Sequence, residues 1–384
     1  MLIYNMSRDK LISRVTNEEL MEKWTVPGSI IGYLGIDPTA PGIHMGHLLS
    51  LHLGIDLLKN GQKLIILIGG FTGQIGDPTD KNAARTRIDN NIAQDNCEGI
   101  LNDIKNILKP YEANVTYVNN KTWLDTMTIS EYLSYYGYTI SVNRKLNMDT
   151  FAKRLSNQSM LSMSEFFYPD LQMIDFHYLN KTYGCNLQLG GGDQFGNIAI
   201  GTHYVEKLTN SSVYGAVTHL LTDGSGTKLG KSLGAKFLKN FKDTYHFCMN
   251  LSDNMANSIC EFFDIEINED PQETKRSLVK YIISLFDQDN YERKFKEIQD
   301  YMNRLFYSSV DQALSEDFIT LTSKSILELV MELSFVQSDF EASQKLRENA
   351  IKINGATVND NITISPGQYK ISMGKKHHAF IHIQ

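Results

Sequence analysis

Residues 33–48 read YLGIDPTAPGIHMGHL and mark a change from strand to helix. An apolar pair typical of a buried strand precedes them, and an apolar helical pattern follows them. Unpaired N–H groups at a helix start carry partial positive charge, which favours a bound phosphate. His44 and His47 lie at this helix start, and Gly46 between them lets another chain or a nucleotide base approach the backbone closely. The pattern indicates a nucleotide site.

Two histidines three residues apart have other interpretations. On spacing alone they are more often ordinary polar residues at a helix start. Zinc is a further interpretation of such a pair, but no nearby Cys or third His completes a zinc ligand set. The histidines alone therefore leave the kind of site open.

Length and composition allow a globular protein of two or three domains, because the chain has 384 residues. No apolar run approaches the roughly 20 residues that span a bilayer, and the start lacks the order of a signal peptide. The four cysteines are scattered without a CxxC pair, which predicts reduced thiols in a cytosolic protein. A formal net charge of −7 argues against indiscriminate nucleic-acid binding but leaves room for a local basic face.

Apolar runs and helical patterns predict the order of the elements. Residues 64–68 are uninterruptedly apolar, which fits a strand buried on both faces of a parallel sheet, and residues 115–118 predict another strand. A glycine-rich turn at residues 69–78 follows the strand predicted at residues 64–68. It lies at the edge of the sheet where doubly wound folds bind ligands. The amphipathic pattern of residues 8–24 predicts a helical arm. Residues 130–160 and 245–320 also predict helices.

Tyr168, Gln172 and Asp175 are spaced by four and three residues, so on a helix they share one face. Such polar groups are costly to bury unless something pairs with them. A solvated face is the alternative interpretation.

Two more glycine-rich turns follow along the chain. Residues 188–197, QLGGGDQFGN, come after an apolar strand, and residues 223–232 read DGSGTKLGKS. Two lysines three residues apart suit closing over a triphosphate, because ammonium groups on flexible stems follow moving charge. An ordinary surface loop is the alternative for a lone KxxKS.

In combination and order, these stretches resemble those of class I aminoacyl-tRNA synthetases, and in detail the bacterial or organellar tyrosyl-tRNA synthetases. HMGH resembles the HIGH signature, YLGIDPTA and GGFTGQIGDP resemble tyrosyl forms, and KLGKS resembles the KMSKS loop. The resemblance covers nearly the whole chain. Tryptophanyl enzymes share the fold and motif order, but Tyr33 together with Tyr168, Gln172 and Asp175 favours a tyrosine pocket.

The resemblance implies an α/β fold with three domains. Residues 1–222 would form a Rossmann-like doubly wound parallel sheet, with a connective insertion at about 120–185 that supplies a dimer interface. Residues 223–320 would hold the KMSKS-like loop and an α-helical domain, and residues 321–384 a small S4-like α+β RNA-binding domain. Asn354-Gly355 between alternating strands predicts a hairpin turn in that tail.

The implied reaction is ATP-dependent activation of L-tyrosine to tyrosyl-adenylate, followed by transfer to the 3′ end of tRNA(Tyr). Such chemistry needs positioning and positive charge, so no protein nucleophile is expected. Mg²⁺ would arrive with ATP, and the sequence offers no metal-ligand set of its own. The residues that the resemblance implies for catalysis are Thr39, His44, His47, Lys81, Arg85, Lys228 and Lys231.

Binding residues follow from the same resemblance. Tyr168, Gln172 and Asp77 would hold the α-amino group, and Asp175 with Tyr33 the phenol hydroxyl. Asn120 is a candidate contact to tyrosine, and Gln194 would hold its carboxylate. Asp193 would take the ribose hydroxyls of ATP. The whole ATP-binding set is Gly35, Asp37, His44, Gly46, His47, Gly191, Asp193, Lys228, Lys231 and Ser232. The RNA-binding set is Lys345, Arg347, Lys352, Lys375 and Lys376.

The resemblance further implies a homodimer in the cytoplasm or an organellar matrix, without membrane attachment. Leu34, Gly192 and Phe195 depart from the family pattern, and the segment after Ser232 is short and lacks Trp. These departures motivate one alternative, a catalytically weakened paralogue with an RNA-binding or regulatory role. A second alternative is a nucleotidyl-transferring enzyme that activates a small amino acid without loading tRNA. The retained motif residues argue against a weakened paralogue. The S4-like tail argues against an enzyme that does not load tRNA. Such a tail is also reused for structural or protein contacts.

Overall fold

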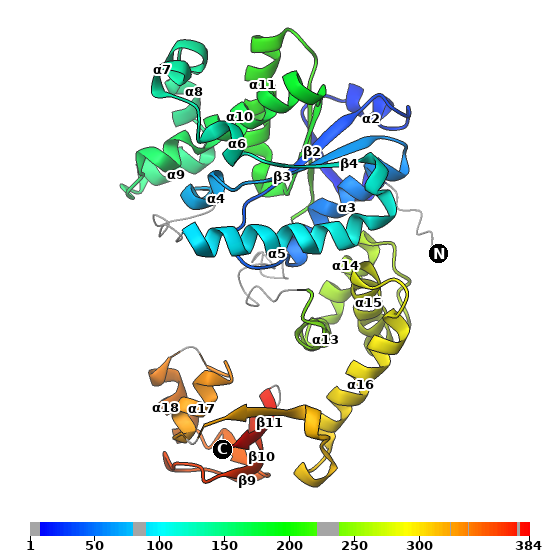
Figure 1. Ribbon diagram of the computed structural model, residues 1–384, viewed down its shortest axis with the longest axis vertical. Helices are drawn as coiled ribbons and strands as arrows, with labels where there is room; N and C mark the ends of the chain where they lie inside the picture. The colour runs from blue at the N-terminus through cyan, green and yellow to red at the C-terminus, as the bar shows by residue number, and fades with distance from the viewer. Residues whose placement is uncertain (1–7, 80–89, 221–237, 323, 337, 375–376) are drawn as a thin grey trace. The chain divides into compact units, whose positions relative to one another are not determined.

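The fold was analysed in a computed structural model that describes residues 8–79, 90–220, 238–322, 324–336, 338–374 and 377–384 (Figure 1). Two compact units divide the chain, Met1–Tyr291 and Glu292–Gln384. Each unit has its own hydrophobic core. The domain boundaries at 222 and 320 stay predictions.

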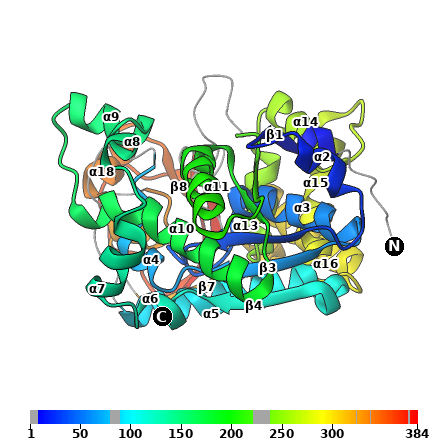
Figure 2. The ribbon, with the colours of Figure 1, turned by 90° about the horizontal axis from the view of Figure 1, so that it is seen from above.

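A six-stranded sheet of order β1-β6-β5-β2-β3-β4 organises the first unit, with β1 and β4 at opposite edges (Figure 2). All neighbouring strands are parallel except the β1–β6 pair, which confirms the predicted doubly wound parallel sheet. The chain order reverses where β2 lies between β3 and β5, and doubly wound folds bind ligands at that point. The strands are β1 (Ile12–Val15), β2 (Ile31–Ile36), β3 (Lys63–Ile68), β4 (Val115–Asn119), β5 (Leu187–Gly190) and β6 (Tyr214–Thr218).

Helices cover both faces of this sheet. Figure 1 shows α10 (Met163–Tyr183) and α11 (Phe195–Thr209) above it, and α3 (Met45–Lys59) and α5 (Asn90–Leu108) below it. Most of α3 is buried, since its sequence is apolar nearly all round. The helix that follows residues 33–44 therefore lies in the core, with only its start available to a ligand.

The prediction of one helical arm over residues 8–24 is wrong. This segment forms α1 (Arg8–Leu11), strand β1 and α2 (Glu19–Trp24). Ile12 and Val15 are β-branched and lie opposite β6, so strand pairing outweighs the local amphipathic pattern. The indole of Trp24 donates to Asp56 at 2.8 Å and fixes α2 against α3.

The insertion after β4 is helical and interrupted, as predicted. Its elements are α6 (Lys121–Leu124), α7 (Ile129–Glu131), the π-helix η2 (Tyr132–Gly137), α8 (Val142–Leu146) and α9 (Asp149–Ser156). Two buried ion pairs join it to α10: Lys145 Nζ lies 2.6 Å from Asp170, and Arg154 Nη1 lies 2.7 Å from Glu165. The insertion is thereby fixed to the helix that carries Tyr168, Gln172 and Asp175.

Helices also follow β6, as the apolar periodicity of residues 245–320 predicts. They are α13 (Phe241–Met249), α14 (Asp253–Phe262), α15 (Pro271–Phe286) and α16 (Tyr291–Tyr307). Tyr281 of α15 hydrogen-bonds the buried His52 of α3, and burial lowers the pKa of that histidine to about 3. This contact fixes α15 to the core of the first unit.

The second unit begins within α16 and contains a five-stranded sheet of order β7-β11-β10-β8-β9, together with helices α17 and α18. Asn354 and Gly355 have φ values of 49° and 86° and join β8 to β9, so the predicted hairpin turn is confirmed. The elements are β7 (Phe318–Leu321), α17 (Ile326–Glu332), α18 (Asp339–Arg347), β8 (Ile351–Ile353), β9 (Ala356–Thr357), β10 (Gly367–Met373) and β11 (His377–Ile383).

All four cysteines are free thiols, and burial raises the pKa of the Cys260 thiol to about 12. Within the described ranges, no helix combines the length and apolar character needed to cross a membrane.

Candidate active site

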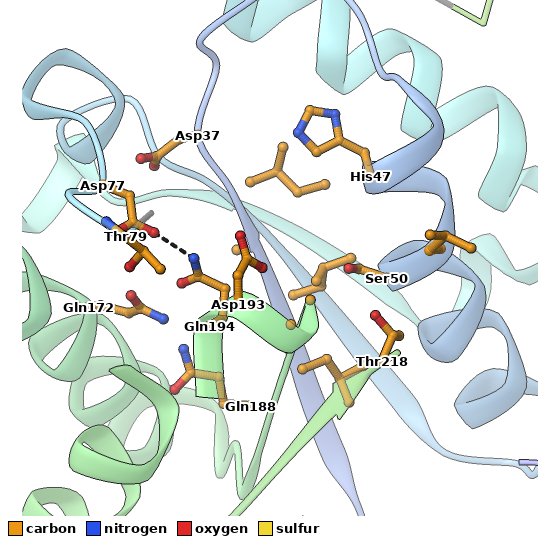
Figure 3. A pocket seen from close by; sticks show the side chains of 18 of the residues that line it. Asp37, His47, Ser50, Asp77, Thr79, Gln172, Gln188, Asp193, Gln194 and Thr218 are labelled. Atoms are coloured by element: carbon orange, nitrogen blue, oxygen red, sulfur yellow. Dashed lines mark hydrogen bonds between the residues drawn. The ribbon is translucent and has the colours of Figure 1, made fainter. Parts of the chain in front are cut away.

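A cavity of about 440 Å³ lies at the carboxyl ends of β2 and β5, where the strand order reverses. Its walls come from the β2–α3 turn, the glycine-rich turn after β3, helix α10 and the glycine turn after β5. Figure 3 shows Asp37, Asp77, Gln172 and Gln194 gathered around one part of it, with His47 at the start of α3. The motifs that are far apart in the sequence therefore meet in one place.

His44 and His47 form a reciprocal cap at the start of α3. The His47 N–H donates to His44 Nδ1 at 3.3 Å, the His44 N–H donates to His47 Nδ1 at 3.4 Å, and the rings stack with centroids 3.7 Å apart. Burial lowers the pKa of both imidazoles. Because each Nδ1 accepts, each neutral ring carries its proton on Nε2 and presents a donor there.

Asp37 at the end of β2 connects three elements. Its carboxylate accepts from the Tyr168 hydroxyl of α10 and from the Thr72 hydroxyl of α4 (Thr72–Ile75), each at 2.7 Å. A Cβ on Gly69 would lie 2.0 Å from Asp37 Oδ1, so this turn requires glycine. Burial and the negative charges of Asp37 and Asp77 raise the pKa of the Tyr168 hydroxyl well above its usual value.

Asp77 and three amide side chains form a second group beside it. The Gln194 amide and the Thr79 backbone N–H donate to the two oxygens of Asp77. Asn197 in turn donates to Gln172 at 3.1 Å and to Gln194 at 3.4 Å. A carboxylate with amide neighbours suits an ammonium group, since it supplies opposite charge and fixed acceptors.

Asp175 and Tyr33 form the floor of the cavity. Asp175 is 3% exposed and accepts from the Trp123 indole at 2.8 Å and the Asn120 amide at 3.0 Å. Burial raises the pKa of this carboxyl to about 8. Within the described part of the chain, the buried Tyr33 hydroxyl and Gln188 Oε1 have no hydrogen-bond partner. Buried polar atoms are normally paired, so this floor suits a ligand with a polar group.

The structure brings most of the predicted tyrosine and ATP residues together. Asn120 is the exception among those described: it is buried one layer behind the cavity wall, where it donates to Asp175 and Thr72. Lys81, Arg85, Lys228, Lys231 and Ser232 lie outside the described residues. The predicted residues that line the cavity are Tyr33, Gly35, Asp37, Thr39, His44, Gly46, His47, Asp77, Tyr168, Gln172, Asp175, Gly191, Asp193 and Gln194.

Several side chains of the site escaped the sequence analysis. Gln188 lines the cavity as a polar residue inside a buried strand, and that exception to the apolar pattern was a usable signal. Ser50 follows His47 by one helical turn, so the helical period pointed to it. Thr218 at the end of β6 and Trp123 behind Asp175 depend on tertiary contacts that no local pattern shows.

The chain belongs to the class I tRNA synthetases of the tryptophan and tyrosine group, whose family model matches residues 27–322. Its similar relatives include the tyrosine–tRNA ligase of Orientia tsutsugamushi (strain Ikeda), which is 33% identical over 92% of both chains. The tyrosine–tRNA ligase of Rickettsia africae is 32% identical over 92% of this chain and 93% of its own.

Solved structures share the fold. A C-terminally truncated mitochondrial tyrosyl-tRNA synthetase from Aspergillus nidulans aligns with a TM-score of 0.66 at 23% identity, covering 76% of this chain and 91% of its own. A tyrosyl-tRNA synthetase from Archaeoglobus fulgidus complexed with L-tyrosine aligns with a TM-score of 0.57 at 16% identity. The alignment covers 75% of this chain and 97% of the Archaeoglobus chain. The class I synthetase fold is thereby confirmed.

Proposed function

We propose that this chain is a tyrosine–tRNA ligase, which activates L-tyrosine with ATP and transfers it to tRNA(Tyr). The floor of the cavity carries the proposal: the Tyr33 hydroxyl is buried without a described partner, and it lies in the same wall as the buried Asp175 carboxyl. A phenol hydroxyl that enters this floor would pair with both. The Orientia and Rickettsia relatives are named tyrosine–tRNA ligases, which supports tyrosine as the amino acid.

The other polar groups orient the substrate. In this proposal the α-ammonium faces Asp77, Gln172 and Tyr168, because Asp77 supplies negative charge beside two neutral partners. Gln194, which donates to Asp77, takes the substrate carboxylate. Asn120 and Trp123 act behind the wall by holding Asp175. Phenylalanine would leave Tyr33 and Asp175 unpaired and is therefore rejected, an effect for which tyrosyl-tRNA synthetases are the general example.

ATP would lie along the start of α3 and the turn after β5. His44, His47 and Thr39 line this part of the cavity, and the exposed Gly46 permits close approach to the helix start. Asp193 takes the ribose hydroxyls, while Gly35, Asp37 and Gly191 shape the remaining wall. The lysines, arginine and serine outside the described residues belong to the proposal through the family resemblance alone: Lys81, Arg85, Lys228, Lys231 and Ser232.

Mg²⁺ would enter as part of the nucleotide substrate. Among the described residues, no three His, Cys, Asp or Glu side chains gather as a metal-ligand set. Magnesium commonly keeps several waters and binds through substrate phosphates, so an all-protein cage is not required.

The first step is attack of a tyrosine carboxylate oxygen on the α-phosphorus of ATP, with loss of pyrophosphate. The neutral rings of His44 and His47 offer Nε2–H donors to phosphate oxygens, and they need no proton exchange to do so. In the second step, a ribose hydroxyl at the 3′ end of tRNA attacks the adenylate carbonyl carbon, and AMP leaves. Positioning supplies most of the acceleration in both steps.

The tRNA would also contact the S4-like second unit. Arg347 at the end of α18 and Lys352 in β8 are exposed, whereas Lys345 pairs with Glu348 at 2.8 Å. Lys375 and Lys376 lie outside the described residues. Exposed basic side chains on neighbouring elements suit a phosphate backbone, although the whole chain is acidic.

Homodimerisation through the insertion is part of the proposal. Large apolar side chains stand exposed there, and contiguous exposed apolar surface is typical of protein interfaces. The exposed fractions are 78% for Ile129, 53% for Leu133, 91% for Tyr138, 74% for Met160 and 68% for Met163. The proposed location is the cytoplasm or an organellar matrix, in keeping with bacterial relatives and mitochondrial structural neighbours.

The test is amino-acid-dependent exchange of labelled pyrophosphate into ATP, with tyrosine, phenylalanine and tryptophan compared. We expect exchange with tyrosine alone. Asp175→Asn should lose that exchange or relax it toward phenylalanine, and Asp95→Asn on the surface of α5 is the matched control. No exchange with any amino acid, from folded protein that binds tRNA, would favour an RNA-binding paralogue instead.

A further inference from the structure

One face of helix α5 packs along the turn between β2 and α3. Asn96 and Asp103 make hydrogen bonds to that turn, and Gly99 lies between them at helical spacings of three and four. The Asn96 amide donates to the Pro38 carbonyl at 3.1 Å, and the Ile43 N–H donates to Asp103 Oδ2 at 3.3 Å. This row of residues therefore contacts the turn near both of its ends.

The middle of the row permits no side chain. A Cβ on Gly99 would lie 2.2 Å from the Pro41 carbonyl oxygen, so the backbone of α5 packs directly on the turn. Asn96 and Asp103 are 5% and 2% exposed. Buried polar groups that lose their partner are costly, so these two bonds specify where the turn lies.

Asp103 also binds the segment that follows the KLGKS stretch in the sequence. Lys239 Nζ lies 3.5 Å from Asp103 Oδ1, and the Leu238 N–H donates to the Ile43 carbonyl at 3.0 Å. Leu238 is 1% exposed, and its own carbonyl accepts from the Thr244 hydroxyl of α13. One carboxylate thus joins the residue before His44 to the first described residues after KLGKS.

We propose that Asn96, Gly99 and Asp103 are positioning residues for adenylate formation. They fix the turn that carries Asp37, Thr39 and His44, and Asp103 ties residues 238–239 to the end of that turn. The inference rests on the proposed function.

The position of Asp103 specifies which kinetic constant should change. Asp103 contacts the His44 end of the turn, whereas the Tyr168–Asp37 bond lies at the other end, beside the proposed tyrosine site. A displaced His44 end would misplace the ATP phosphates and leave tyrosine binding intact. Loss of Asp103 should therefore lower kcat and raise the KM for ATP without raising the KM for tyrosine.

The experiment compares Asp103→Ala, Asp103→Asn and the surface control Asp95→Ala in tyrosine-dependent pyrophosphate exchange. Small misplacements of reacting groups are costly, so we expect kcat to fall at least about tenfold in Asp103→Ala, with the KM for tyrosine within about twofold. Asp103→Asn keeps an acceptor for the Ile43 N–H and loses only the charge toward Lys239. Its kcat should therefore fall less than that of Asp103→Ala. Asp95→Ala should match the unmodified chain.

Two results would overturn the inference while leaving the proposed function intact. One is unchanged kcat in folded Asp103→Ala. The other is a loss of kcat with an equal rise in the KM for tyrosine, which would mean that tyrosine binding is lost as well. If Asp103→Ala does not fold, Asp103→Asn is judged by the same split between the kinetic constants. Absence of tyrosine-dependent exchange in the unmodified chain would overturn the proposed function and this inference together.

Discussion

The Tyr168 hydroxyl donates to Asp37 Oδ2 across 2.7 Å and joins helix α10 to the end of β2. The same carboxylate accepts from Thr72, so the glycine-rich turn after β3 belongs to the group as well. Three stretches that are separate in the sequence therefore share one carboxylate. The proposed tyrosine site depends on this junction as much as on the residues that would touch the substrate.

Tyr168→Phe tests the junction. A hydrogen bond to a charged group contributes about 1.5–3 kcal/mol, so we expect kcat/KM for tyrosine to fall about 10- to 100-fold. The measurement is steady-state pyrophosphate exchange at varied tyrosine. Tyr138→Phe is the control, because its side chain is 91% exposed. An unchanged kcat/KM in Tyr168→Phe would contradict a functional role for the bond.

Asp175 should make stability depend on pH. Its pKa is raised from 3.8 to about 8 by burial, so folding favours the protonated form. That contribution is complete below about pH 4 and is lost as the pH rises through about 8. We expect the difference in unfolding free energy, unmodified chain minus Asp175→Asn, to fall between about pH 5 and about pH 8. Urea titrations at several pH values measure it.

The control for this pH dependence is Asp95→Asn, whose carboxylate lies on the surface of α5. Its difference from the unmodified chain is the baseline with which the Asp175→Asn difference is compared. A flat difference for Asp175→Asn would show that the carboxyl is ionised throughout.

Gly46→Ala should separate stability from activity. Alanine at an exposed helical position stabilises by roughly 0.5–1 kcal/mol relative to glycine. The new Cβ would lie 3.1 Å from His44 Cε1, so the histidine ring must move and the stacked pair is disturbed. We expect adenylate formation to slow at least about tenfold, while the free energy of unfolding changes by less than about 1 kcal/mol because the disturbed His44 cap opposes the gain in helix propensity.

Gly196→Ala is the matched control, because Gly196 is also the second residue of a helix. A Cβ there would meet only Met148 Cε, at an ordinary 3.8 Å. It should stabilise without slowing the reaction. If both variants keep full activity, the geometry of the histidine pair is not needed for the first step.

Lys145 and Asp170 should matter far more to stability than an exposed pair does. Both side chains are 2% exposed, so Lys145→Met leaves a buried carboxylate without its cation and should cost about 3–5 kcal/mol of unfolding free energy. Lys121→Met breaks the exposed pair with Asp125 and should cost about 0.5 kcal/mol or less. Equal losses in urea denaturation would contradict this account.

The periodicity of apolar residues and the placement of glycines predicted most of the strands and helices of the fold. Strand β3 is apolar without interruption because both of its faces are covered, and Tyr168, Gln172 and Asp175 do line one cavity because α10 is a regular helix. The strand at residues 12–15 was missed because its pairing with β6 joins residues about 200 positions apart.

Contacts between distant residues limited the prediction of the site. Asp37 was assigned to ATP through resemblance, and nothing local indicated that Tyr168 would donate to it. Asn120 was expected at the substrate, yet it supports Asp175 from behind the wall. The row of Asn96, Gly99 and Asp103 has no signature of its own, since its partners are backbone groups of a turn far away in the sequence.

The buried ion pairs between the insertion and α10 have a thermodynamic consequence. Asp170 projects from the side of α10 opposite Tyr168 and Gln172, and Lys145 binds it from the insertion that exposes apolar side chains. In the proposed dimer, subunit association and tyrosine binding both act on α10, and we predict that the two equilibria are linked through this helix. Linkage is reciprocal, so tyrosine should strengthen association by the factor by which association strengthens tyrosine binding. Sedimentation with and without saturating tyrosine measures that factor, and a factor of one would mean that each subunit binds its substrate independently.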